Sequence, residues 1–514
     1  MSTVVVDSRV AIDTAREETR TWVRGLSGAL TLAGITLIAI LIHGFHPYAD
    51  DAGIYVSGVV QALHPGRFGP SAPFIAAYTH LSIFSWLVAA LVRLTRLPIS
   101  AVLLVFQFGG IWLLLYGSRQ IARKCFVSEA ASWGAVAMVA VCLTVPVAGT
   151  GLVIMDPYVT SRTLSTPLTL LAIDSALDRR MLKPGGWLAL IAFIHPLMAI
   201  YAAGFVLLLA AAQAGRWRLL AGLTSAPVAI AAALWYSQRH VVESQAYRIA
   251  VLTRGYFYLS CWQWYEIFGL IGPILLIAGY CWWKRWEWRR PDLSLGIACI
   301  AIACSSVAVA ACFAHPGSHS HLIARLQTLR PYVIVYFVLF LSIGAVLEQQ
   351  LLRGKLWRCV LTFGLIGAGV SSAQFVLYAS AAHLELPWQQ PKNSWVQAFR
   401  WVRANTSVNA VFALDANYID APGEDTEGFR AIAQRASIAD LSKDGGAAAV
   451  FPRLAQSWLT ESTAAEHLSG ISDAERIRRL APLHVSWMVL RQSAVTGFDC
   501  PYHNAVVKVC RLGN

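Results

Sequence analysis

Charged residues are scarce in this chain. They make up 13% of its 514 residues, about half of the roughly 25% that is usual in soluble globular domains. Hydrophobic residues reach 57% and the mean hydropathy is +0.55. Soluble proteins do not average so apolar, whereas long uncharged runs are typical of membrane spans. The composition therefore excludes a soluble enzyme and predicts a polytopic α-helical membrane protein.

Several functional motifs are also absent. The sequence contains no P-loop, no dinucleotide-binding fingerprint and no nucleophile elbow, so it lacks the common marks of a nucleotide-dependent enzyme or a serine hydrolase. It also shows no internal repeat, whereas many transporters are built from such repeats. No low-complexity tract occurs either.

The ten cysteines have no metal-ligand spacing over most of the chain. Eight lie in or beside apolar segments and are expected to be small core residues. These eight are Cys125, Cys142, Cys261, Cys281, Cys299, Cys304, Cys312 and Cys359. Cys500 and Cys510 differ because they lie in a polar tail, where a disulfide is expected if that tail is outside the cytoplasm.

What charge there is has a strong basic excess, with a formal net charge of +13. The basic residues gather in short loops between apolar runs, for example at 118–124 and 284–290. That distribution follows the positive-inside rule, so the expected partner is the lipid bilayer with its anionic headgroups and not a nucleic acid.

The apolar runs predict about 11 crossings. Residues 1–24 are expected to form a cytoplasmic arm, and Leu26–Ile42 is a first span, too long and without the cleavage site of a removed signal peptide. We expect 73–95 to be an interfacial or re-entrant helix. The run 186–212 is interrupted at His195-Pro196, which predicts two short arms with a turn between them.

From about residue 383 the composition becomes more polar. We therefore divide the chain into the arm, a membrane module over 25–382, and a small mixed α/β extracytoplasmic domain over 383–514. The outer loops of the module are expected at 43–97, 149–163, 237–264 and 314–331. In the tail we expect a helix at 395–403 and strands at 410–414, 484–490 and 505–510.

Two adjacent aspartates, Asp50 and Asp51, follow the first span on its outer side. Neighbouring carboxylates repel each other, so one of them should have a raised pKa unless a cation lies nearby. This arrangement suits a general base or a cation site. The alternative is a helix N-cap, because aspartate favours that position before a helix that begins at Ala52.

Other polar residues hidden among apolar runs emerge on the same side. Besides the aspartate pair they are Asp156, Arg162, His195, Arg254, Glu266, His319, Arg325 and Arg330. Arginines bind phosphate in bidentate fashion, and a carboxylate can take a proton from an acceptor hydroxyl. Two alternatives stay open: Asp156 with Arg162 as a structural ion pair, and His195 as a packing histidine.

Three histidines, His315, His319 and His321, follow one of the spans. They would bind a divalent cation such as Zn²⁺ or Mn²⁺ if a carboxylate completed the shell. Loop histidines near lipid headgroups are the alternative. The sequence therefore assigns no residue as a metal ligand, and a divalent cation is the one cofactor that it suggests.

The order of these features resembles the GT-C superfamily of integral-membrane glycosyltransferases, which use polyprenyl-phosphate-linked sugars. The shared layout is one span, an outer loop that opens with Asp-Asp, a second acidic residue in the Met155-Asp156-Pro157-Tyr158 segment, many further spans, and an outer C-terminal domain. The segment Trp401-Val-Arg-Ala-Asn-Thr-Ser-Val-Asn-Ala-Val-Phe412 is similar to a W-I-R-x-N-T-P-x-D-A-V-F segment of such bacterial proteins. The chain lacks the fuller acidic motif of oligosaccharyltransferases, which argues against protein N-glycosylation.

The resemblance implies an inverting glycosyltransferase in the bacterial inner membrane, with its C-terminal domain in the periplasm. It would move a sugar from a polyprenyl-phosphate donor to an unknown acceptor, which is a glycan, a lipid or a protein. Asp50, Asp51 and Asp156 would be catalytic, and the remaining polar residues named above would bind substrate. The alternatives are a transporter or flippase of a lipid-linked precursor and a non-catalytic scaffold.

Overall fold

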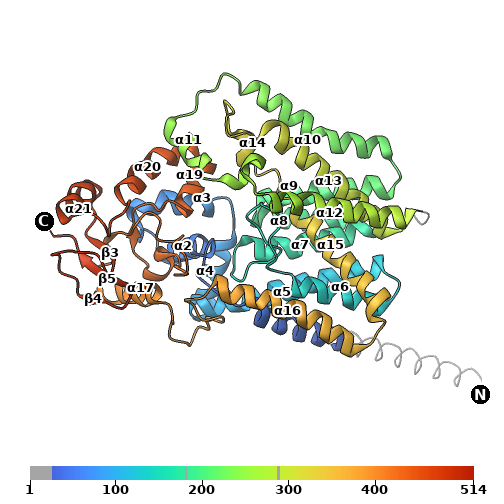
Figure 1. Ribbon diagram of the computed structural model, residues 1–514, viewed down its shortest axis with the longest axis horizontal. Helices are drawn as coiled ribbons and strands as arrows, with labels where there is room; N and C mark the ends of the chain where they lie inside the picture. Colours follow the sequence, from blue (N-terminus) through green and yellow to red (C-terminus); the bar gives the residue numbers. More distant parts are fainter. Residues whose placement is uncertain (1–25, 180–181, 286–289, 514) are drawn as a thin grey trace, which may run out of the picture.

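The computed structural model describes residues 26–179, 182–285 and 290–513. The cytoplasmic arm predicted at 1–24 lies outside the described residues. The long helices run side by side through one half of the molecule, and the C-terminal domain forms the other half (Figure 1). Helices α2 (Ala52–Leu63) and α3 (Ala72–Thr79) lie between the two halves.

Within the described ranges, eight helices are long and apolar enough to cross a membrane. They are Leu26–His43, α5 (Ile99–Cys125), α9 (Pro196–Gln213), α10 (Trp217–Ser237), α12 (Trp264–Trp283), α13 (Pro291–Phe313), α15 (Tyr332–Leu347) with its continuation to Leu352, and α16 (Leu356–Leu377). The chain is thus a mostly helical, multi-pass membrane protein.

All eleven crossings predicted from the sequence form helices, but three are shorter than a span. These are α6 (Glu129–Val141), α7 (Ser161–Leu177) and α8 (Leu182–Ile194), with 13, 17 and 13 residues. At 1.5 Å per residue a 13-residue helix is about 20 Å long, less than the roughly 30 Å hydrocarbon layer. By length and composition together, the described residues support eight spans and do not confirm eleven.

The segment expected to be interfacial or re-entrant is sharply bent. It comprises a stretch from Gly69 to Thr79 that ends in α3, followed by α4 (Phe84–Thr95), and the two parts meet at an angle of 108°. A straight crossing is thus excluded for this segment. The predicted break at His195 is confirmed, because α8 ends at Ile194 and α9 begins at Pro196.

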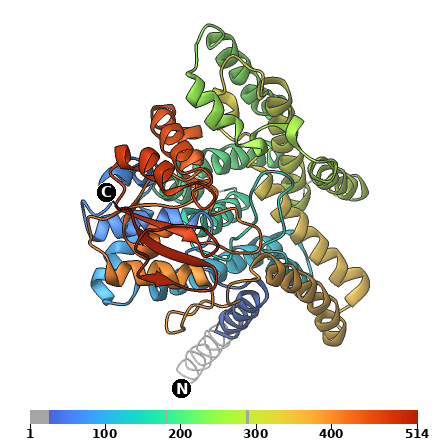
Figure 2. The same ribbon diagram turned by 60° about the vertical axis from the view of Figure 1, so that its left-hand side comes forward.

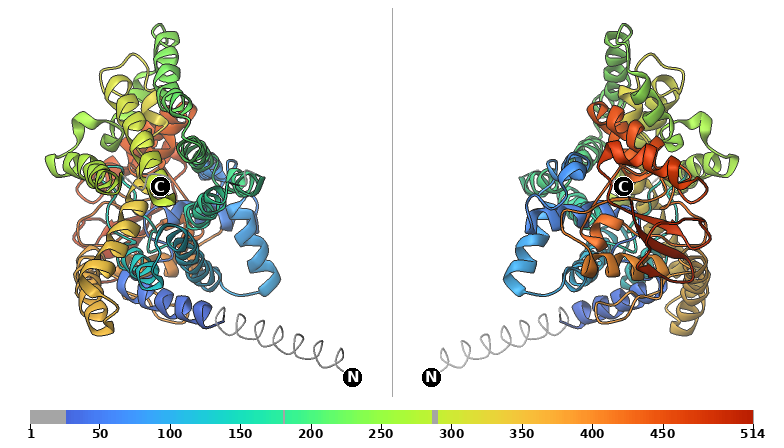
Figure 3. Two further views of the ribbon diagram at one scale, coloured as in Figure 1. Left: turned by 90° about the vertical axis from the view of Figure 1, so that its right-hand side faces the viewer. Right: turned by 90° about the vertical axis from the view of Figure 1, so that its left-hand side faces the viewer.

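Burial differs strongly among the long helices. The most hydrophobic window of α15 is 72% buried, whereas those of α10, α12 and α16 are at most 17% buried. Leu275 in α12 and Leu365 in α16 are 65% and 66% exposed. Such exposed leucines are expected where a helix faces lipid, since lipid replaces a protein neighbour. The end-on view places these peripheral helices around the bundle (Figure 3).

The C-terminal domain contains one five-stranded mixed sheet with helices around it (Figure 2). The strand order is β2-β1-β3-β5-β4; β1 pairs in parallel with β2 and β3, and β5 pairs antiparallel with β3 and β4. The strands are β1 (Val411–Ala413), β2 (Ala436–Ser437), β3 (Trp487–Arg491), β4 (Tyr502–His503) and β5 (Val507–Arg511). The helices are α17 (Ser394–Asn405), α18 (Phe429–Ala433), α19 (Lys443–Val450), α20 (Ala455–Ala464) and α21 (Asp473–Leu480). The one helix and three strands predicted in the tail are confirmed.

The C-terminal domain packs directly on short helices of the membrane module. A shared hydrophobic cluster joins α3 and α11 (Gln245–Leu252) to α19 and α20, with Trp458 fully buried in it. At α2 the backbones of Gly53 and Gly428 meet so closely that a Cβ on Gly53 would lie 2.8 Å from the Gly428 Cα. Only glycine allows this approach, and it holds the start of α2 against the C-terminal domain.

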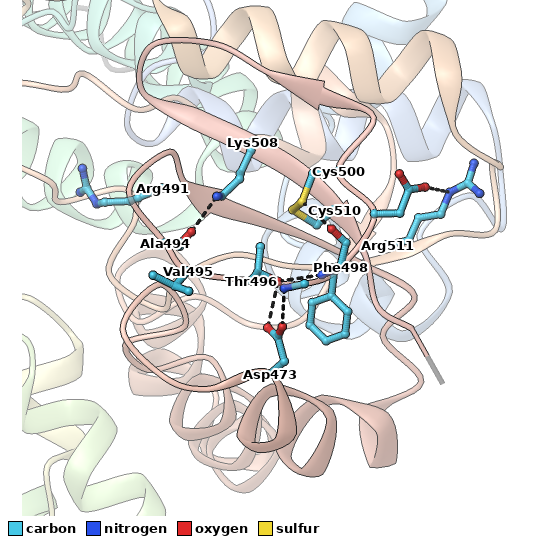
Figure 4. The surroundings of a disulfide bond; sticks show 12 residues. Asp473, Arg491, Ala494, Val495, Thr496, Phe498, Cys500, Lys508, Cys510 and Arg511 are labelled. Atoms are coloured by element: carbon cyan, nitrogen blue, oxygen red, sulfur yellow. Dashed lines mark hydrogen bonds and ion pairs between the residues drawn. A yellow bond between two sulfur atoms is a disulfide. The ribbon is translucent and has the colours of Figure 1, made fainter.

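Cys500 and Cys510 form the predicted disulfide, which ties β5 to the segment before β4 (Figure 4). The sequence separation is 10 residues, so the bond closes a short loop. Replacing both cysteines by serine is expected to lower the free energy of unfolding by roughly 2–3 kcal/mol. Denaturant unfolding in detergent measures this change. Cys304→Ser is the matched control, because Cys304 is a free cysteine that is exposed and not the core residue that the sequence predicts. Maleimide labelling of Cys500 or Cys510 without prior reduction would contradict the bond.

Candidate functional site

Asp50 and Asp51 lie in the turn between the first span and α2. Asp50 has a φ of +47°, a left-handed conformation that aspartate tolerates better than most residues. Asp51 occupies the N-cap position of α2, but its side chain makes no capping hydrogen bond. The carboxylate instead faces charged side chains from two distant segments, so the capping interpretation does not account for it.

Arg162 is the first of these partners. It lies in the first turn of α7, where Thr160 caps the helix by accepting a hydrogen bond from the Arg162 backbone. Its guanidinium donates to Asp51 Oδ2 from Nη1 and Nη2, at 3.1 and 3.2 Å. It also donates to Asp156 Oδ2 from Nη2 and Nε, at 3.0 and 3.3 Å. One buried arginine thus bridges the two carboxylates.

Asp156 lies behind Arg162 and does not line the cavity described below. Only 7% of Asp156 and 8% of Arg162 is exposed. Burial raises the pKa of Asp156, and the guanidinium of Arg162 opposes that rise. This geometry favours the structural alternative for the pair: Asp156 fixes the orientation of Arg162, which in turn holds Asp51.

We call the cluster of Asp50, Asp51, Asp156 and Arg162 the acidic corner. Two side chains that the sequence does not indicate, those of Lys443 and Tyr158, complete it. Lys443, the first residue of α19, forms ion pairs with Asp50 and Asp51, and its Nζ lies 3.4 Å from Asp51 Oδ1. The Tyr158 hydroxyl donates to Asp50 Oδ2 at 2.7 Å. Tyr158 stands in the segment that suggested Asp156, whereas nothing around Lys443 distinguishes it in the sequence.

A cavity of about 640 Å³ opens in front of this corner. Seven of the ten residues predicted for the site line it: Asp50, Asp51, Arg162, His195, Arg254, Arg325 and Arg330. Because they border one space, they lie on one side of the membrane regardless of how the spans are counted. Its size is within the usual range for a small-molecule site.

The remaining lining is largely apolar. The apolar side chains that contribute to it are those of Leu81, Ile194, Leu197, Ile200, Leu326, Val450 and Phe451. They come from the bent segment, the break at His195, the loop before α15, and α19 with its C-cap. A cavity with charged and apolar walls suits a ligand that has both an anionic group and a hydrocarbon part.

Three arginines form the basic wall of the cavity. In the described part of the chain no carboxylate lies within ion-pair distance of Arg254, Arg325 or Arg330. Arg254 donates to the Leu441 carbonyl at 3.3 Å, and Arg325 donates to the Val450 carbonyl at 3.5 Å. The Nε of Arg330 is buried without a hydrogen-bond partner among the described residues. Their positive charge is therefore not balanced locally, unlike that of Arg162.

His195 lines the same cavity at the break between α8 and α9. Burial, together with the nearby positive charges of Arg162 and Arg330, lowers its pKa to about 3. The imidazole is therefore neutral at physiological pH and can donate or accept one hydrogen bond toward a ligand. This position agrees with a site residue better than with a packing histidine.

Glu266 and His319 do not line the cavity. The Glu266 carboxylate accepts a hydrogen bond from the Gln263 backbone N–H at 2.7 Å and so caps α12. His319 borders a separate space of about 10 Å³ near Arg239. The positions of these two residues do not support the substrate-binding role that the sequence predicts.

The histidine loop is held together by Glu243. The carboxylate of Glu243 accepts from the His321 backbone N–H at 2.7 Å and lies 2.6 Å from His321 Nδ1. Across the ranges that the structure describes, no three His, Cys, Asp or Glu residues group as metal ligands. A divalent cation stays a prediction from the sequence.

No protein-family model matches the chain, and no curated protein matches it. Among solved structures, the archaeal oligosaccharyltransferase AglB from Archaeoglobus fulgidus, in complex with an inhibitory peptide and a dolichol-phosphate, is similar with a TM-score of 0.47 and 12% sequence identity. The match covers 90% of this chain and 69% of that chain. At this TM-score the likeness does not establish a shared fold.

Proposed function

We propose that this protein is a membrane glycosyltransferase that moves a sugar from a polyprenyl-phosphate-linked donor to an acceptor hydroxyl at the outer face of a bacterial inner membrane. The observation that carries the proposal is the single cavity that joins an acidic corner, an unbalanced arginine wall and an apolar lining. Each part meets one need of the reaction: a base, a phosphate site and room for a lipid.

The chemistry follows from these parts. A carboxylate of the Asp50–Asp51 pair takes the proton of the acceptor hydroxyl, and the acceptor oxygen attacks the anomeric carbon of the sugar. The bond between that carbon and the phosphate oxygen breaks, and polyprenyl phosphate leaves with the electron pair. Attack opposite the leaving group inverts the configuration. Arg254, Arg325 and Arg330 stabilise the negative charge that grows on the phosphate.

The test measures binding and transfer on the same protein. Arg325→Gln and Arg330→Gln should each weaken the binding of a short-chain polyprenyl phosphate to the purified protein about 10- to 100-fold, because a hydrogen bond to a charged group contributes roughly 1.5–3 kcal/mol. The control is Arg239→Gln, a basic residue of the same outer region that lies outside the cavity. Polyprenol without phosphate should compete poorly.

Transfer is then followed in membranes from producing cells, with polyprenyl phosphate carrying a radiolabelled hexose or pentose. We expect label to move to a second product, and the arginine variants to lower its rate. Binding without any transfer, over the whole donor panel, would contradict the glycosyltransferase and favour the flippase or the scaffold.

A further inference from the structure

Lys443 reaches the acidic corner from the far end of the chain. Its contact with Asp51 spans 392 sequence positions. It belongs to the C-terminal domain, whereas the aspartates follow the first membrane span. Its side chain is 18% exposed, compared with 49% for Asp50 and 32% for Asp51. The ammonium group is thus mostly enclosed between the two halves of the molecule.

Lys443 offsets one of the three negative charges of this corner. Three carboxylates, those of Asp50, Asp51 and Asp156, face Arg162 and Lys443. Arg162 contacts Asp51 and Asp156 but not Asp50. In the described structure Lys443 is therefore the one cationic side chain within ion-pair distance of Asp50. With both cations present, the corner has one negative charge in excess, so one carboxylate is not neutralised by an ion pair.

We propose that Lys443 is a positioning residue of this site, and that its ammonium group offsets the repulsion between the Asp50 and Asp51 carboxylates and holds both toward the cavity. The inference rests on the proposed function and adds the C-terminal domain to the active site. Without Lys443, no described cationic side chain would lie within ion-pair distance of Asp50, and the repulsion between the two adjacent carboxylates would push them apart.

Several charged groups surround Lys443 besides the aspartate pair. On its own segment, Asp440 accepts a hydrogen bond from the Lys443 backbone N–H, and Asp444 forms a bidentate pair with Arg430 of α18 at 2.8 and 2.7 Å. From the segment that follows α11, the Arg254 guanidinium donates a hydrogen bond to the carbonyl of Leu441. From α3, the Tyr78 hydroxyl approaches Gly446.

These surroundings set the pH range of the effect. Burial lowers the pKa of Lys443 to about 8. Burial and the neighbouring Asp444 raise the pKa of Asp440 to about 8. Lys443 is therefore charged below about pH 8 and loses its charge above it. Activity should fall as the pH rises through this value, because the carboxylates then lose one of their two cations.

The first experiment compares Lys443→Gln and Lys443→Arg with the wild type in the transfer assay. Lys443→Gln should lower the rate about 100-fold, the effect expected when a catalytic group is misplaced by about 1 Å. Lys443→Arg should restore much of the rate and remove the alkaline fall below about pH 10, since arginine stays charged there. Lys392→Gln, in the same domain but outside the cavity, should behave as wild type. An unchanged alkaline fall in Lys443→Arg would overturn the proposal.

The second experiment does not depend on transfer. Lysines of the full-length protein are reductively methylated with ¹³C-formaldehyde, and the Lys443 signal is identified by its loss in Lys443→Arg. We expect this signal to titrate near pH 8, and at lower pH in Asp50→Asn because one carboxylate is gone. The same titration in wild type and Asp50→Asn would overturn the inference. If it shifts while no sugar is transferred, the coupling stands and the proposed function fails.

Discussion

Replacing Arg162 by methionine should lower the free energy of unfolding by about 3–5 kcal/mol, the cost of leaving one member of a buried ion pair without its partner. Asp156 would then lie buried with no cation beside it, and Asp51 would keep Lys443 alone. Thermal unfolding in detergent measures the loss. Arg478→Met is the matched control, because Arg478 is 76% exposed in its pair with Glu475, and its unfolding temperature should match that of the wild type.

The pH dependence of this variant has a definite sign. Burial already raises the pKa of Asp156 while Arg162 opposes the rise, so the loss of Arg162 raises that pKa further. A carboxyl with a higher pKa in the folded than in the unfolded state stabilises the fold at low pH and loses that stability as pH rises. Arg162→Met should therefore recover stability as the pH falls from neutrality, more than the wild type does.

A double variant separates charge from packing. Asp156→Asn in the Arg162→Met background removes the buried carboxylate that has no partner, so it should regain a large part of the lost stability. Equal unfolding temperatures for the single and the double variant would show that Arg162 acts by filling space and not by pairing with Asp156.

The sequence predicts most helices because the length of an apolar run and the position of a proline act locally. The break at His195-Pro196 is an example, since proline cannot continue the hydrogen-bond ladder of α8. Length fails as a guide at α6, where a helix of 13 residues packs within the bundle against α5 and α15. Its ends depend on these neighbouring helices and not on the apolar run itself.

In the candidate site too, the sequence predicts some residues, and others depend on how distant segments pack together. Seven predicted residues meet because charged side chains among apolar runs gather where water reaches the module. Lys443 could not be found in this way, since its contact with the aspartates depends on how the C-terminal domain docks through Gly53 and Gly428. Asp51 does take the N-cap position, but the direction of its carboxylate follows from Arg162. Glu266 has the local role of a helix cap, which a capping box could have indicated.

We expect Asp50 and Asp51 to have different roles in the reaction. Both oxygens of Asp50 have near partners, Tyr158 at 2.7 Å on Oδ2 and Lys443 on Oδ1. Asp51 holds Arg162 through Oδ2, while its Oδ1 has Lys443 no nearer than 3.4 Å. The Oδ1 of Asp51 therefore has the freer lone pairs, and we expect Asp51 to be the base and Asp50 to anchor Lys443.

Asp51→Asn should thus lower sugar transfer by at least about 10²-fold, within the usual range for the loss of a general base. The acid side of its pH–rate profile should also disappear, because no carboxyl of the base remains to be ionised. Asp50→Asn should lose less and keep that acid side, since the amide oxygen of asparagine still accepts from Tyr158. Asp420→Asn, an exposed residue of the C-terminal domain, is the control and should transfer at the wild-type rate. The reverse order, with the acid side lost in Asp50→Asn alone, would assign the base to Asp50, and full activity in both variants would remove the acidic corner from the reaction.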